Sequence, residues 1–310
     1  MLHFGLETAK LFAMNRTIKS LTGSPLIVLV LFVAPGLARA KMVEEVIKVP
    51  VEVVNVYGKT AQHDILVTLF YDDRTPAPRP VLLLNHGRAP EAPARAALGR
   101  VKYTPNSKWF AGFGFLVAVP TRLGYGETGG EDVEDSGACN AKQYEGVYEA
   151  AVRQTRSVLD TLRQRPEVSK DRAIVVGQSF GGTTAVAVAA QNLAGVQGAI
   201  NFAGGGGGNP KTRAQDPCGS AQLKRLFANY GKSARTPMLW IYSENDMYFG
   251  PKLPREWFEA FQASGGAGEF AQFPPHTDDG HSLFTRGPEL WHPKVTEFLQ
   301  RVGYSPLIKP

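Results

Sequence analysis

The sequence predicts an α/β protein built on a mostly parallel, doubly wound sheet that is entered through an N-terminal antiparallel hairpin. From residue 81 onward, short and fully apolar segments alternate with helical stretches. Apolar runs without polar alternation indicate strands buried on both faces, as in a parallel sheet covered by helices. Before them, two β-branched segments alternate apolar and polar residues, which predicts two antiparallel strands. Together these observations define the fold class.

The expected elements follow one another without a dividing linker or an internal repeat. The hairpin strands are residues 46–54 and 65–71, and the proline-rich stretch Thr75–Pro80 ends the pair. The buried strands are expected at Val81–Asn85, Leu116–Pro120, Ala173–Gly177, Gly198–Phe202, Met238–Tyr242 and Glu269–Phe273. The helices are expected at Tyr144–Arg163, Thr183–Leu193, Ala221–Tyr230, Pro254–Ala263 and Pro293–Val302. Residues 41–310 are therefore predicted to form a single domain.

The first 40 residues have the pattern of a secretory signal peptide. Scattered basic residues precede the apolar run Leu26–Ala34, and Ala38-Arg39-Ala40 forms an A-x-A exit. The alternative is a membrane anchor, but the apolar run is well under the ~20 residues that a spanning helix needs. We therefore expect cleavage after Ala40, a secreted or periplasmic protein, and no stable membrane insertion.

Composition and cysteine content indicate which partners, cross-links and cofactors to expect. The formal net charge of +6 comes without a basic run interleaved with aromatic residues, so we expect no nucleic-acid partner. In an exported protein, the even pair Cys139 and Cys218 predicts a disulfide, which would stabilise the fold by roughly 4 kcal/mol. Two free thiols are the alternative. No Cys/His cluster has metal-ligand spacing, and we expect no metal or other cofactor.

One serine follows a predicted strand in a glycine-rich turn. Gly177-Gln-Ser-Phe-Gly181 matches G-x-S-x-G, and Gly182 extends it. A sharp turn from strand to helix needs glycines where chain segments approach closely, and it leaves the serine hydroxyl clear of the sheet. The next amide, on Phe180, lies at a helix N-terminus, where an oxyanion would be stabilised. An ordinary turn serine is the alternative, but the strand–turn–helix context favours Ser179 as a nucleophile.

A nucleophilic serine needs a base, and the base needs an orienting acid. Both are expected after the serine, in loops that follow later strands. Asp246 is the candidate acid, with Glu244 as its rival in the same loop. His281 is the candidate base, with His276 as its competitor.

The loop Asn85–Arg88, after the third expected strand, is the predicted source of a second oxyanion donor. Gly87 permits a tight bend, and the amide of Arg88 is the expected donor. His86 precedes the serine in the chain, so we interpret it as structural support for the oxyanion hole and not as the base.

With these motifs, the chain resembles the α/β-hydrolases, and most of all the dienelactone-hydrolase-like serine esterase and peptidase group. The resemblance runs from about Val46 to Val302. The motifs on which the resemblance rests are Leu84–Gly87, Pro120–Gly126, Gly177–Gly182, Glu244–Asp246 and Asp279–His281. It implies an α/β-hydrolase fold with a triad of Ser179, Asp246 and His281 and an oxyanion hole formed by the amides of Phe180 and Arg88. Because dienelactone hydrolases proper use a cysteine nucleophile, the serine favours an ordinary ester over a lactone.

Specificity is expected from loops at the same sheet edge. The candidates are Arg122–Asn140, the glycine run Gly204–Gly208 and a candidate small lid near residues 209–235. A disulfide between the two cysteines would tie two of these loops together. The acidic cluster Glu131–Asp135 is expected to be solvated, with cation binding as the alternative. The glycine run lacks G-x-G-x-x-G spacing, so we do not expect phosphate binding there.

The sequence thus predicts an exported serine hydrolase, most similar to a carboxylesterase, that cleaves a small-molecule ester through an acyl-enzyme. One alternative is a serine peptidase or amidase of the same fold, although no propeller-sized extension that would gate peptides is present. The other is a binding protein that keeps the fold without catalysis, but such proteins usually lack a triad member.

Overall fold

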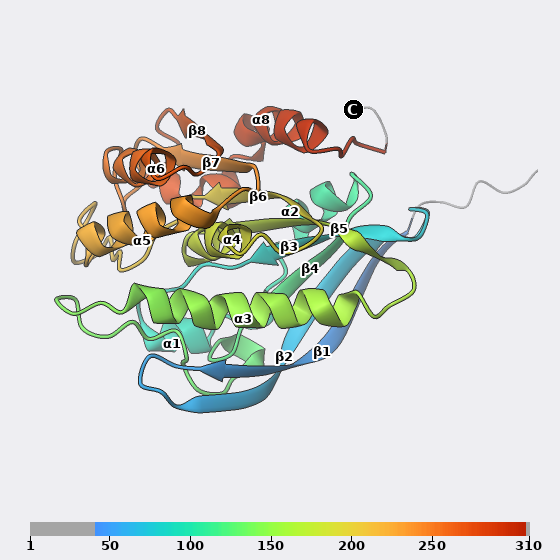
Figure 1. The fold of residues 1–310 in the computed structure, drawn as a ribbon, viewed down its shortest axis with the longest axis horizontal. Helices are drawn as coiled ribbons and strands as arrows, with labels where there is room; N and C mark the ends of the chain where they lie inside the picture. Colours follow the sequence, from blue (N-terminus) through green and yellow to red (C-terminus); the bar gives the residue numbers. More distant parts are fainter. Residues whose placement is uncertain (1–40, 308–310) are drawn as a thin grey trace, which may run out of the picture. The chain divides into compact units, whose positions relative to one another are not determined.

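Eight strands form a single sheet in the part of the chain that the structure, a computed structural model, describes, which is residues 41–307 (Figure 1). Their order across the sheet is β1-β2-β4-β3-β5-β6-β7-β8. The strands are β1 (Met42–Val54), β2 (Thr60–Asp72), β3 (Arg79–Asn85), β4 (Leu116–Thr121), β5 (Val168–Gln178), β6 (Val196–Phe202), β7 (Met238–Ser243) and β8 (Gly268–Phe273).

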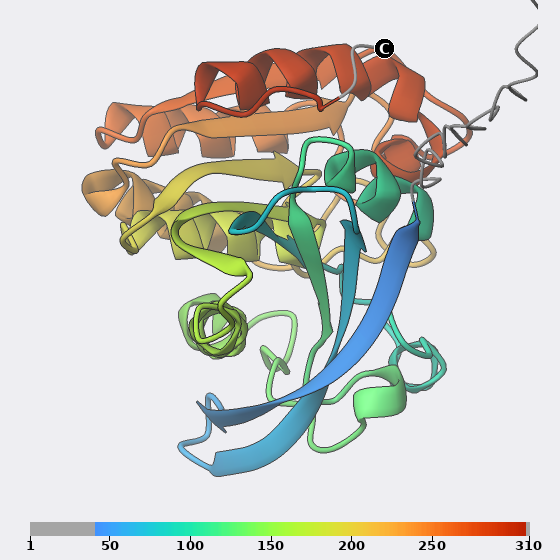
Figure 2. The same ribbon diagram turned by 90° about the vertical axis from the view of Figure 1, so that its right-hand side faces the viewer.

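The strand directions confirm the predicted fold class. β1 pairs with β2, and β2 with β4, in antiparallel fashion, whereas every pair from β4 through β3 to β8 is parallel. Figure 2 shows the strong twist of this sheet from β1 to β8. The predicted signal peptide lies outside the described residues. No helix within residues 41–307 is long and apolar enough to cross a membrane.

Helices cover both faces of the sheet (Figure 2). They are α1 (Ala92–Ala96), α2 (Thr104–Ala111), α3 (Tyr144–Leu162), α4 (Phe180–Ala190), α5 (Ser220–Ser233), α6 (Leu253–Ala263), α7 (Leu283–Arg286) and α8 (Pro288–Arg301). Buried side chains of α3 to α6 pack on one face and those of α2 and α8 on the other, in two hydrophobic clusters.

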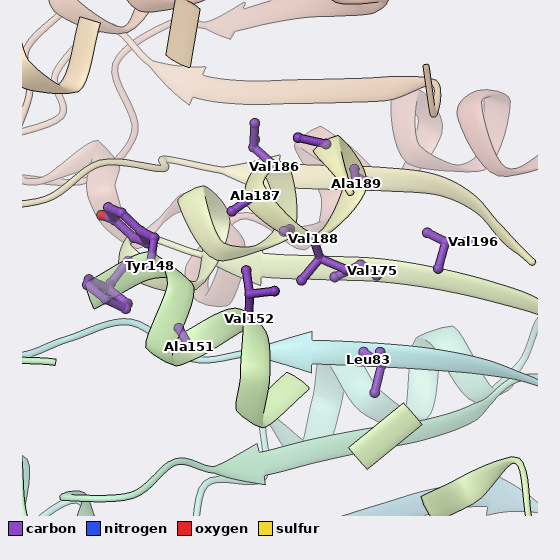
Figure 3. Packing of buried hydrophobic residues seen from close by; sticks show 14 of the residues in the cluster. Leu83, Tyr148, Ala151, Val152, Val175, Val186, Ala187, Val188, Ala189 and Val196 are labelled. Atoms are coloured by element: carbon purple, nitrogen blue, oxygen red, sulfur yellow. The ribbon is translucent and has the colours of Figure 1, made fainter. Parts of the chain in front are cut away.

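Strand β3 shows how the two clusters arise from one strand. Leu83 belongs to the cluster under α3 and α4, while Leu82 and Leu84 belong to the cluster under α2 and α8. Successive side chains of a strand point to opposite faces, so an uninterrupted apolar run is buried on both sides. Figure 3 shows Val152 of α3 and Val188 of α4, which belong to the same cluster as Leu83, facing the sheet.

The starts of two helices differ from expectation by three residues or more, and α4 and α5 also end three residues away from their expected ends. α4 begins at Phe180, directly after the serine, and not at Thr183. α8 begins at Pro288, with Pro293 inside the helix, because Pro288 also satisfies the preference for proline in the first turn. The short helices α1, α2 and α7 were not expected, since their few apolar residues give no clear helical period.

Candidate active site

Ser179 lies at the junction of β5 and α4 in a backbone conformation that is rare for a side-chain-bearing residue. Its φ and ψ are 59° and −123°, and its amide donates a 2.8 Å hydrogen bond to the carbonyl of Phe202. The flanking glycines permit this turn. A Cβ on Gly177 would lie 1.9 Å from the carbonyl oxygen of Gly181, and a Cβ on Gly181 would lie 2.1 Å from that of Asn85. The serine is therefore fixed at the carboxyl end of the sheet, 8% exposed.

Asp246 and His281 come together from the loops after β7 and β8. The Nδ1 atom of His281 lies 2.9 Å from Oδ2 of Asp246, whose side chain is fully buried. The other carboxylate oxygen accepts hydrogen bonds from the amides of Tyr248 (2.8 Å) and Phe249 (3.0 Å). Because a carboxylate can only accept, Nδ1 carries the proton of a neutral imidazole and Nε2 is left as the basic atom.

The loop that carries His281 is itself anchored. The Asp279 carboxylate accepts hydrogen bonds from the amide of His281 (2.9 Å) and from that of Met247 (3.0 Å), so Asp279 also links the loops after β7 and β8. The ring of Tyr248 stacks on the imidazole with 4.0 Å between centroids.

Ser179 and His281 lie at the same edge of the sheet. The neighbouring Gln178 donates from Nε2 to the carbonyl of His281 at 3.1 Å. Within residues 41–307, however, no hydrogen bond joins the Ser179 hydroxyl to Nε2 of His281. Catalytic hydrogen bonds are often long in a free enzyme and tighten with substrate. The roles of Ser179 and His281 therefore stay predictions.

The rival residues are placed differently. Glu244 follows β7 directly, and its side chain is exposed. His276 is half-buried beside Gly287, where a glycine Cβ would come within 3.0 Å of its Nε2. The structure thus pairs Asp246 with His281, and neither rival takes part in that contact.

The two predicted oxyanion donors lie beside the serine turn. A Cβ on Gly87 would be 3.1 Å from Cβ of Ser179, so the loop before Arg88 passes against the nucleophile's own backbone. Among the described residues, neither the amide of Phe180 nor that of Arg88 donates a hydrogen bond to the protein. Two free N–H groups near a hydroxyl fit an oxyanion hole, and that role stays a prediction.

His86 is buried in the loop that carries Arg88. Its Nδ1 lies 2.7 Å from the carbonyl oxygen of Gly87, and its Nε2 accepts a hydrogen bond from the amide of Arg122 at 3.1 Å. This pair of bonds requires the neutral tautomer with a proton on Nδ1. Burial, aided by the charges of Arg122 and Arg88, lowers the pKa of His86 well below its usual value. Both ring nitrogens are therefore engaged within the protein, and support of an oxyanion hole by His86 stays a prediction.

The acidic cluster Glu131–Asp135 is solvated only in part, because Asp135 is exposed whereas Glu134 is buried. Glu134 is fully buried against Arg122, with 2.6 Å between Oε1 and Nε. Asp132 forms ion pairs with Arg88 (2.7 Å) and Arg95 (3.0 Å), and Glu131 pairs with Lys59 (2.6 Å). No local sequence signal reveals these pairings, because the acidic residues and the arginines that they contact stand apart in the chain.

A cavity of about 320 Å³ opens beside Ser179. The glycine run forms part of its wall, packed against aromatic rings. A Cβ on Gly206 would lie 2.8 Å from Cε1 of Tyr144, and the hydroxyl of Tyr148 donates to the carbonyl of Gly205 at 2.8 Å. The lining also includes Arg88, Pro90, Arg95, Asp135, Ser136, Gly137, Lys142, Phe180, Asn209, Tyr248 and Phe249.

The predicted disulfide is present and joins two loops of this region. Cys139 and Cys218 are bonded, with 5.0 Å between their Cα atoms. In the candidate lid, Asn209 lines the cavity, whereas α5 packs Leu223 and Phe227 into the core. The candidate small lid near residues 209–235 stays a prediction.

The sheet topology is that of the α/β-hydrolase fold, which solved structures of this fold share. The chain belongs to the dienelactone hydrolase family, whose model matches residues 97–301. It is therefore a hydrolase. No curated protein matches the sequence.

Solved structures share the fold at low sequence identity. An acetyl xylan esterase from a Paenibacillus species is 17% identical, with a TM-score of 0.54 over 85% of this chain and 88% of that one. An esterase from Pyrococcus furiosus is 14% identical, with a TM-score of 0.53 over 82% and 90%. The acylaminoacyl peptidase of Pyrococcus horikoshii is 13% identical, with a TM-score of 0.56 over 87% of this chain and 43% of that one. At such identities the likeness shows the fold alone.

Proposed function

We propose that this hydrolase is an exported serine esterase that cleaves small carboxylic esters through an acyl-enzyme. The observation that carries the proposal is the buried Asp246–His281 pair at the sheet edge where the strained Ser179 turn ends. A serine, an imidazole and a buried carboxylate in this chain order are the parts that acyl transfer needs.

The proposed reaction has two halves, acylation of Ser179 and hydrolysis of the acyl-enzyme. The Ser179 hydroxyl attacks the ester carbonyl while Nε2 of His281 takes its proton, and Asp246 stabilises the imidazolium through Nδ1. The amides of Phe180 and Arg88 bind the developing oxyanion. Collapse of the tetrahedral intermediate releases the alcohol, which takes the proton from His281. Water, activated by the same imidazole, then hydrolyses the acyl-enzyme. Substrate binding must bring the hydroxyl and Nε2 within hydrogen-bonding distance.

The cavity favours small and polar esters. At about 320 Å³ it lies at the lower end of the volumes typical of small-molecule sites. Its wall offers backbone groups of the glycine run and charged side chains such as Lys142, and few large apolar surfaces for a long acyl chain. Two of the three fold relatives named above are esterases by name.

Export is supported by two features of the chain. Disulfides persist in oxidising compartments, and Cys139 and Cys218 are bonded. The first 40 residues carry the signal-peptide pattern described above.

The test uses Ser179→Ala with Ser233→Ala, an exposed serine of α5, as the matched control. We expect a fluorophosphonate probe to label the wild type and the control but not Ser179→Ala, and p-nitrophenyl acetate hydrolysis to be lost only in Ser179→Ala. Unchanged hydrolysis in Ser179→Ala contradicts the proposal. Faster cleavage of a matched p-nitroanilide than of the ester contradicts the esterase assignment.

A further inference from the structure

The loop that carries the Arg88 amide is held by a buried network of charged groups. Arg122 and Glu134 are both fully buried and form two contacts, 2.6 Å between Nε and Oε1 and 3.2 Å between Nη2 and Oε2. The hydroxyl of Tyr125, also fully buried, donates to Oε2 of Glu134 at 2.6 Å. Burying an ion pair costs solvation that only good geometry with further hydrogen bonds offsets, so such a pair is not explained by stability alone.

Arg122 contacts His86 at two points. Its backbone amide donates to Nε2 of the imidazole at 3.1 Å, and its Nη1 donates to the carbonyl oxygen of His86 at 2.8 Å. The first bond keeps Nε2 unprotonated, and a neutral imidazole then has its proton on Nδ1. Arg122 thereby fixes both the tautomer and the position of His86.

His86 in turn sets the orientation of one peptide group. Its Nδ1–H donates to the carbonyl oxygen of Gly87 at 2.7 Å. That carbonyl and the N–H of Arg88 belong to the same peptide unit, which is planar and trans, so the two bonds point in opposite directions. Holding the carbonyl toward the imidazole therefore aims the Arg88 N–H away from it and prevents the peptide from rotating.

The side chain of Arg88 is anchored to the same network. Its guanidinium contacts both oxygens of Asp132, at 2.8 and 2.7 Å, and donates to the Tyr125 hydroxyl at 2.8 Å. Tyr125 thus joins the Arg88 side chain to Glu134. The Gly87–Arg88 peptide is held on its carbonyl side through His86 and at its following side chain through Asp132.

We propose that Glu134 is a positioning residue for the oxyanion hole, acting through Arg122 and His86 on the Gly87–Arg88 peptide. The inference rests on the proposed function, because the hole stabilises the transition state of acyl transfer. It gives the buried part of the acidic cluster a role in the reaction, although Glu134 touches no substrate.

The test compares Glu134→Gln with Glu131→Gln, a neighbour in the same loop that pairs with Lys59 at the surface. Active sites are titrated with a fluorophosphonate, so that kcat is expressed per competent enzyme. We expect Glu134→Gln to lower kcat for p-nitrophenyl acetate about tenfold or more while KM stays within twofold, since loss of an oxyanion donor lowers kcat by about 10²–10³ and a misaligned one by less. The affinity for an alkylboronic acid, whose tetrahedral adduct places an oxygen in the hole, should fall by a similar factor. Glu131→Gln should match the wild type in all three.

The inference is overturned if Glu134→Gln folds and keeps the wild-type kcat per titrated site. This holds also when the melting temperature of the variant is lower, because the residue then contributes to stability alone. If Glu134→Gln does not fold, His86→Ala and His86→Asn decide, because asparagine keeps an N–H donor close to the position of Nδ1. We expect His86→Ala to lose kcat and His86→Asn to recover most of it, whereas equal activities overturn the inference.

Activity surviving in Ser179→Ala refutes the proposed function itself. An inactive Ser179→Ala beside a fully active Glu134→Gln refutes only the positioning role.

Discussion

At the scale of single residues, this candidate site is held by groups that each satisfy several constraints. The backbone of Ser179 occupies a conformation that costs about 1–3 kcal/mol for a residue with a side chain. The tight contacts of Gly177 and Gly181 leave that turn no space to relax. Asp246 uses one oxygen for two backbone amides and the other for His281. The carboxylate cannot rotate without losing all three bonds, so the imidazole keeps one orientation.

Asp246→Asn is expected to lower kcat for ester hydrolysis by about 10³–10⁴, because an amide can donate to Nδ1 and so favours the wrong tautomer of His281. KM should change little, since the shape of the site is kept. Glu244→Gln removes the rival carboxylate two residues earlier, where the side chain is exposed, and should leave kcat near wild type. Steady-state kinetics with p-nitrophenyl acetate compares the two. Similar losses in both variants would contradict the assignment of Asp246 as the acid.

At the scale of elements, the sequence predicts the sheet well because its signal is local. Each buried strand is a short apolar run, and all eight expected strands are present within a few residues of their observed bounds. The helix α2 escapes prediction since it is only eight residues long, with its apolar side chains at the C-terminal end. The predicted start of α8 at Pro293 is wrong because two prolines, Pro288 and Pro293, both suit a first turn.

The parts of the candidate site were predictable to different degrees. Ser179, Asp246 and His281 each follow a strand in a recognisable motif, so chain order alone places them at one edge. The pairing of Glu134 with Arg122 was not predictable, because a run of acidic residues in a sequence looks the same whether water or arginine faces it. The contact requires the loop between β4 and α3 to fold back on itself, which no local pattern reports.

The close approach of α4 to β3 gives a prediction about stability. Replacing Gly181 by alanine would place a Cβ 2.1 Å from the carbonyl oxygen of Asn85, a backbone atom that cannot rotate away. Alanine gains about 1 kcal/mol over glycine as a helix former. The overlap should outweigh that gain, and we expect Gly181→Ala to lower the free energy of unfolding by about 3 kcal/mol.

Gly58→Ala is the control for Gly181→Ala. Its φ is +77° and nothing lies within 4 Å of its Cβ position, so it should lose only the roughly 1 kcal/mol due to a left-handed backbone. Urea denaturation measures both variants. If Gly181→Ala is no less stable than Gly58→Ala, the backbone around Ser179 is looser than its contacts indicate.

At the scale of the whole molecule, the candidate site depends on segments from most of the chain. The oxyanion loop comes from the first third, Ser179 from the middle, and Asp246 and His281 from the last quarter, and the parallel strands bring their loops to one edge. The disulfide adds a covalent link outside the sheet. It ties the loop before α3 to the loop before α5, and both loops supply residues to the cavity beside Ser179.

The double variant Cys139→Ser/Cys218→Ser is expected to lower the free energy of unfolding by about 4 kcal/mol. The bridge spans 79 residues, and its loss returns that much loop entropy to the unfolded chain. Because both tethered loops line the cavity, KM for a small ester should rise while kcat per titrated site changes less. Chemical denaturation and steady-state kinetics measure the two effects, and the wild type in a reducing agent should behave like the double variant. A double variant with the denaturation midpoint and KM of the oxidised wild type would mean that the core and the sheet hold these loops without the bridge.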